Sequence, residues 1–136
     1  MYILKNIDKQ LLPHVLFTTD EEIGGIGAQA LSKRPNPFKD LRYIIQLDRR
    51  GANDCVFYDC ANDEFVEYVE SFGFVEAYGS FSDISTICPA WKIAGVNLSI
   101  GYVDEHSFSE TLFVGVMNRT IKLVIRMLKD AKNAKT

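Results

Sequence analysis

Side chains that could bind a metal ion follow three of the apolar runs in this chain. These side chains are Asp20, Glu21, Glu22, Asp48, Asp104, Glu105 and His106. If the runs are strands of an open α/β sheet, the residues that follow them lie at the edge where such folds bind ligands. Two carboxylates and an imidazole suit zinc or a similar divalent ion, and a further carboxylate would remain free to act as a base.

Five short apolar runs are predicted to form the strands that position these residues. Runs rich in apolar and β-branched residues are typical of strands that are buried on both faces. The predicted strands are residues 14–19, 42–48, 55–60, 74–78 and 95–102. We expect the third of them at the edge of the sheet and the last in its interior.

Amphipathic segments between the strands predict helices that pack on the sheet. Asn62 is predicted to cap a helix whose apolar residues recur at helical spacing until Gly73 ends it. A capping box at residues 107–110 predicts the start of a long C-terminal helix, whose apolar face spans residues 112–128. A further helix is expected at residues 25–33, and a short helix or turn at residues 82–88. The predicted fold is an α/β three-layer sandwich with a mixed, mostly parallel sheet flanked by helices.

Composition narrows the possible partners and the compartment. The chain has 136 residues, 47% of them hydrophobic, which is enough apolar material for one domain with a core. A net charge of −3 without a basic stripe argues against nucleic acid, and no apolar run is long enough to span a membrane. Three cysteines without a CxxC pair, and the lack of a secretory signal, favour a cytoplasmic protein with structural thiols.

The residues around the candidate ligands resemble those of the dinuclear zinc exopeptidases, a family of aminopeptidases, some carboxypeptidases and acylamino-acid deacylases. The matching blocks are residues 18–25, 27–28, 46–51, 82–83, 98–102, 105–107 and 110. Each block is short, but their order and spacing together are specific. Because the resemblance covers nearly the whole chain, we expect residues 1–136 to form a single, partial zinc exopeptidase-like catalytic domain.

The resemblance implies a role for each candidate residue. Glu21, the first of the paired glutamates, corresponds to the general base that takes a proton from the metal-bound water. Glu22 and His106 would bind one zinc ion, and Asp48 would bind the other. The implied cofactor is a pair of zinc ions, and the implied substrates are peptides or N-acyl amino acids.

Two ligands of the family pattern are not found in this sequence. They are a histidine in a His-x-Asp motif and an aspartate that bridges the two metal ions, and both would lie upstream of Met1. Residues 2–4 read as part of a helix that has already begun, which agrees with a domain lacking its first strands. His14 is expected at the wrong end of its strand to replace the missing histidine. We therefore expect weak metal binding and little hydrolysis from this chain alone.

Several of these residues also have plain structural explanations. Residues 20–22 could be acidic residues at a helix start, Asp48 a turn residue and His106 a loop residue. Ser107 and Glu110 are assigned to capping, and helix capping also explains residues 82–83. Arg49 and Arg50 are expected to be solvated or paired with carboxylates, and Trp91 and the cysteines to serve in packing.

Two other function classes remain open from the sequence. Residues 25–30 match G-x-G-x-x-A between a predicted strand and a helix, with Asp48 about 20 residues further on, as in dinucleotide-binding folds. Against this, residues 20–22 lengthen a turn that should be tight and place negative charge beside a pyrophosphate. The other class is a catalytically inactive family fragment, structural or self-associating, that forms homo-oligomers through an exposed sheet.

Overall fold

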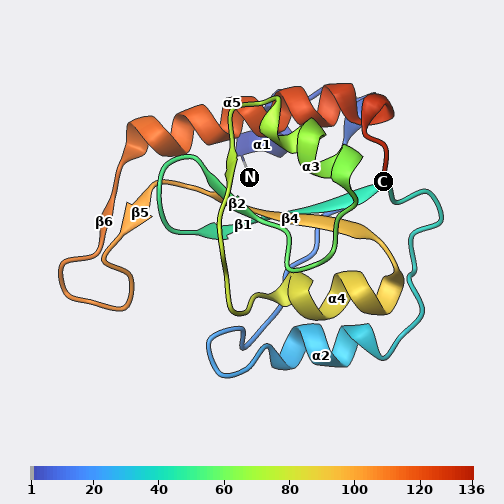
Figure 1. Cartoon of the computed structure of the whole chain (residues 1–136), viewed down its shortest axis with the longest axis horizontal. Coiled ribbons are helices and arrows are strands. Elements are labelled where there is room, and N and C mark those ends of the chain that lie inside the picture. Colours follow the sequence, from blue (N-terminus) through green and yellow to red (C-terminus); the bar gives the residue numbers. More distant parts are fainter. Residues whose placement is uncertain (1) are drawn as a thin grey trace.

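A four-stranded sheet lies at the centre of the fold in the computed structural model, which describes residues 2–136 (Figure 1). Its strands are β1 (Tyr43–Arg49), β2 (Asp54–Val56), β3 (Val75–Glu76) and β4 (Ala94–Ser99). Their order in the sheet is β1-β4-β2-β3. The pairs β1–β4 and β2–β3 are parallel, and β2–β4 is antiparallel. The predicted mixed, mostly parallel sheet is therefore confirmed.

Helices cover both faces of this sheet. The helices on one side are α1 (Tyr2–Asn6), α3 (Asp63–Glu70) and α5 (Val114–Asp130), and those on the other side are α2 (Ile26–Ser32) and α4 (Asp83–Trp91) (Figure 1). Two short 3-10 helices complete the set, η1 (Lys9–Leu11) and η2 (Ala131–Asn133). This α/β arrangement is compatible with the expected three-layer sandwich.

The main core lies between the sheet and the layer formed by α3 and α5. Val96 and Leu98 of β4 are fully buried there, together with Phe65 of α3 and Met127 of α5. Burying one such side chain stabilises a fold by roughly 1.5–3 kcal/mol. These contacts confirm that β4 is an interior strand, and they fix the sheet edge beyond which the candidate site lies.

Local capping signals set the ends of α3 as predicted. The Asn62 side-chain oxygen accepts a hydrogen bond of 2.8 Å from the backbone N–H of Phe65. After the helix, Gly73 adopts a φ of +90°, a left-handed conformation that favours glycine. The prediction for this helix is therefore confirmed at both ends.

The predicted buried strand at residues 14–19 is wrong. These residues run as an extended segment that belongs to neither sheet, and the Phe17 side chain is 83% exposed. Among residues 2–136, no strand pairs with the outer side of β1, so this segment has no neighbouring ladder to join. Two contacts join the segment to the rest of the fold. The Thr18 hydroxyl donates a hydrogen bond to Asp83 at the start of α4, and the His14 ring stacks on the Phe38 ring with the centroids 4.3 Å apart.

The predicted capping box at residues 107–110 is also wrong. These residues form the loop of a hairpin whose strands are β5 (Tyr102–Val103) and β6 (Thr111–Leu112), and α5 begins only at Val114. The Ser107 and Glu110 side chains bond within the loop itself, to Asp104 and His106, instead of capping a helix.

Two strand predictions also need correction in their placement. β2 lies between β4 and β3, so it is an interior strand and not the predicted edge strand. β1 is an edge strand, and most of its residues are only half-buried.

In the part of the chain that the structure describes, no helix combines the length and the hydropathy required to cross a membrane.

Candidate metal centre

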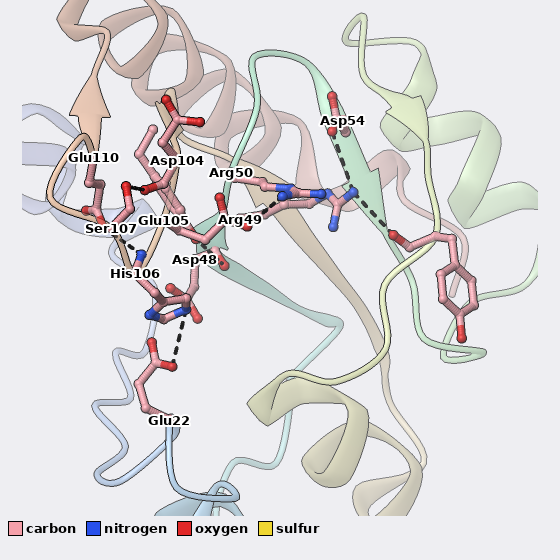
Figure 2. A network of polar contacts seen from close by, with 12 residues as sticks. Glu22, Asp48, Arg49, Arg50, Asp54, Asp104, Glu105, His106, Ser107 and Glu110 are labelled. Atoms are coloured by element: carbon pink, nitrogen blue, oxygen red, sulfur yellow. Dashed lines mark hydrogen bonds and ion pairs between the residues drawn. The ribbon is translucent and has the colours of Figure 1, made fainter.

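Three segments that are distant in the sequence meet beyond the C-terminal end of β1. They are the turn at residues 20–24, the end of β1 itself and the β5–β6 loop at residues 104–110 (Figure 2). His106 points from the loop towards Glu22 in the turn, and its Nε2 atom lies 3.6 Å from the Glu22 Oε2 atom. Both side chains are well exposed, at 69% and 72%. The structure thus brings together two of the predicted metal ligands.

Asp48 lies in a β-bulge near this pair. The pairing of β1 with β4 shifts register between Gln46 and Arg49, which leaves an extra residue on β1. Bulges of this kind redirect side chains at the edges of sheets. Figure 2 shows the Asp48 side chain beside His106, and Gln46 donates a hydrogen bond of 3.3 Å to its carboxylate.

The Asn97 side chain holds the bulge in place, a role that the sequence analysis missed. Asn97 is only 2% exposed, and its side-chain oxygen accepts a hydrogen bond of 3.1 Å from the backbone N–H of Asp48. Its amide group donates to the Asp48 carbonyl at 3.3 Å and to the Ser82 hydroxyl at 3.2 Å. A polar residue within the otherwise apolar run at 95–98 was the available signal, because a buried amide needs partners.

The carboxylates at this end of the sheet affect one another's protonation. Burial raises the pKa of Glu21, and the negative charges of Asp48, Glu22 and Asp83 raise it further, while His106 lowers it. Burial likewise raises the pKa of Asp48, followed by the charge of Glu22. A base with a raised pKa accepts a proton more readily, which suits the role expected for Glu21.

Asp83 anchors the turn that carries the paired glutamates. It is the first residue of α4 and only 6% exposed, and one of its carboxylate oxygens accepts a hydrogen bond from the Thr18 hydroxyl. A Cβ atom on Gly25 would lie 3.3 Å from its other oxygen, Oδ1, so the turn packs closely on this carboxylate. Oδ1 has no hydrogen-bond partner among the described residues. Capping, the alternative for residues 82–83, is confirmed for Ser82, which forms a capping box with Ser85.

These residues fit zinc in part. With metal–ligand distances near 2.1 Å and tetrahedral angles, a nitrogen and an oxygen on one zinc ion lie about 3.4 Å apart. The 3.6 Å between His106 and Glu22 is close to this value, and imidazole with carboxylate is a suitable donor pair. Across residues 2–136, however, no three His, Cys, Asp or Glu side chains form a group that could hold an ion. Asp48 is therefore near the pair without completing a site with it.

The glycines of the G-x-G-x-x-A match do not follow a strand. Residues 14–19 belong to no sheet, and the turn at residues 20–24 separates them from α2. Dinucleotide-binding folds need a tight connection from a strand to the helix at this point. The described structure does not provide that context.

Comparison with known proteins adds no relative. No protein-family model, no curated protein and no solved structure matches the chain. The resemblance to zinc exopeptidases therefore remains a prediction from short sequence motifs, and the function has to be inferred from the chemistry of these side chains.

Proposed function

We propose that this chain forms part of a zinc exopeptidase centre built on a zinc exopeptidase-like core, with peptide or N-acyl amide bonds as its substrates. The observation that carries the proposal is the approach of His106 to Glu22 across the end of β1. The motif resemblance assigned these two residues to the same zinc ion, and the fold brings them to a separation that suits it.

In this proposal each residue has one task. Glu22 and His106 hold one zinc ion, Asp48 is a ligand for a second, and Glu21 is the base that accepts a proton from the attacking water. When bound, zinc supplies a Lewis acid that acidifies water and polarises the scissile carbonyl. The raised pKa of Glu21, caused first by burial and then by the neighbouring carboxylates, supports its assignment as the base.

Two ligands on one ion predict weak binding. A catalytic zinc site normally uses three protein ligands, and here only Glu22 and His106 are paired. We therefore expect partial zinc occupancy and little or no hydrolysis from this chain alone.

Three free, buried cysteines support the cytoplasm as the compartment, because thiols persist in reducing surroundings.

Zinc titration by calorimetry tests the proposal. We expect weak binding that His106→Ala and Glu22→Gln each abolish. His14→Ala is the matched control, since His14 is the only other histidine and its ring stacks on Phe38. Absence of zinc binding, or equal losses in the control, would refute the proposal, and tight binding of two ions would show that the ligand count is wrong.

A self-associating, catalytically inactive domain is the second candidate. Exposed apolar side chains on the extended segment favour it, with Val15 at 46%, Leu16 at 43% and Phe17 at 83% exposure, and β1 has an open edge in the described chain. Open edges and apolar patches of this kind promote association between copies. This candidate predicts a dimer in size-exclusion chromatography that Phe17→Ser weakens, whereas a monomer at all concentrations would exclude it.

A further inference from the structure

The position of His106 depends on a hairpin that its own ladder holds weakly. β5 and β6 pair through only two residue pairs, Tyr102 with Leu112 and Val103 with Thr111. Isolated two-stranded hairpins are marginally stable in water. Contacts outside the ladder must therefore keep the loop at residues 104–110 over the end of β1.

The loop backbone also needs external support. Asp104 and His106 adopt φ angles of +56° and +61°, in the left-handed region that is unfavourable for residues with a Cβ atom. Such conformations persist where the surrounding structure holds them. Within the loop, the His106 N–H donates to Glu110 and the Ser107 hydroxyl donates to the Asp104 carbonyl, but neither bond ties the loop to the sheet.

Backbone hydrogen bonds attach the base of the hairpin to the sheet. The Gly51 N–H donates to the Tyr102 carbonyl at 2.9 Å, and the Gly101 N–H donates to the Gly51 carbonyl at 2.9 Å. The Tyr102 hydroxyl reaches the Asp48 carbonyl at 3.4 Å. These bonds end at Tyr102 and do not reach the tip, where the contact of His106 with Glu22 joins two exposed side chains.

One ion pair reaches further along the loop, towards its tip. The Arg50 Nη1 atom lies 2.7 Å from the Glu105 Oε1 atom, at hydrogen-bond distance (Figure 2). Arg50 follows Asp48 by two residues, and Glu105 directly precedes His106. The pair thus joins the segment that carries one predicted ligand to the loop that carries another. It also confirms that Arg50, as expected, is paired with a carboxylate.

The burial of this pair is uneven. The Glu105 side chain is 25% exposed and that of Arg50 64%. Exposed ion pairs contribute little on average, but a short charge-assisted hydrogen bond to a largely buried carboxylate is among the stronger ones. This geometry favours a defined contact over two independently solvated side chains.

We propose that Arg50 and Glu105 are positioning residues that hold His106 over the end of β1, within reach of Glu22 and Asp48. The effect on metal binding rests on the proposed zinc function, whereas the effect on the loop does not. Measurements on the metal-free and the zinc-titrated protein therefore test the two parts separately.

The metal-free test uses 15N relaxation of residues 104–110 in Arg50→Gln and in Glu105→Gln. We expect backbone order parameters near 0.85 to fall below about 0.6 in both variants. The charge swap, Arg50→Glu with Glu105→Arg, should restore order, and Lys122→Gln on the exposed face of α5 is the control. Unchanged order in both single variants, or no recovery in the swap, would overturn the proposal.

The second test titrates the same variants with zinc ions alone. We expect affinity to fall about two- to five-fold in each single variant, the range of a partly exposed ion pair, and to recover in the swap. Equal affinity in all variants while the loop becomes mobile would overturn the link between positioning and binding. If the unsubstituted chain binds no zinc but its loop loosens as described, the zinc proposal fails and the positioning role stands.

Discussion

Replacing Asn97 with leucine should destabilise the fold and disturb the site at the same time. The buried amide makes three hydrogen bonds, two with the Asp48 backbone and one with the Ser82 hydroxyl. Leucine has the same branched shape but cannot form any of them, so the N–H of Asp48 in the bulge loses its side-chain partner and the C=O keeps only the Tyr102 hydroxyl. Leaving one buried polar group without a partner costs about 1–3 kcal/mol. Since water can reach part of the bulge, we expect a loss of about 2–4 kcal/mol in the free energy of unfolding.

Urea unfolding followed by circular dichroism measures this loss directly. The control is Asn133→Ala, because Asn133 is exposed and donates only to the neighbouring Asp130. Surface substitutions of this kind change stability by less than about 0.5 kcal/mol. A cost as small as this for Asn97→Leu would show that the amide does not hold the bulge. Weaker zinc binding in the same variant would link the bulge to the site.

Other expected outcomes follow from contacts around the site and in the core. Thr18→Val removes the hydroxyl that donates to the buried Asp83 carboxylate, so unfolding measurements should show a loss of about 1–3 kcal/mol, whereas Thr18→Ser should retain most of the stability. Any hydrolysis of peptide substrates by this chain should fall about 10²–10⁴-fold in Glu21→Gln at unchanged zinc occupancy, and retained turnover would remove Glu21 as the base. Burial raises the pKa of Cys55 and of Cys88 to about 12, so a thiol reagent at pH 8 should modify them only after unfolding. Because these folded-state values lie above the ordinary value of about 9, the stability that the neutral thiols contribute is complete below pH 9 and is lost as the pH rises towards 12.

The sequence predicted those elements whose signals are local and agree with their packing. In α3, the cap at Asn62, the apolar face and the stop at Gly73 all indicate one helix, and the structure contains it. The segment at residues 14–19 has only its apolar composition as a signal. Composition favours a strand, but a strand also needs a neighbour with free backbone groups, and that depends on the rest of the chain.

The capping box shows how a correct local rule can fail. Ser107 and Glu110 have the spacing of a helix start, and Glu110 does accept a hydrogen bond from a backbone N–H, although a capping box would use the N–H of Ser107. The donor is His106, but it lies in a left-handed conformation within a hairpin loop, so the same bond closes a turn. A pattern of two side chains cannot distinguish the two outcomes, because the backbone between them decides.

The sequence offers candidate residues for the site but not the geometry that brings them together. Residue type and position gave a wider set of charged residues after the apolar runs, and the family resemblance selected Glu22, Asp48 and His106 from it. Their separations depend on features that no single segment encodes: a bulge held by Asn97 from the next strand, and a hairpin tied to the sheet by Arg50. The bulge and the hairpin place His106 beside Glu22. Among the described residues, however, Glu22, Asp48 and His106 do not form a group that could hold one metal ion. The geometry of the candidate site therefore depends on Asn97, Arg50 and Glu105 as much as on the candidate ligands themselves.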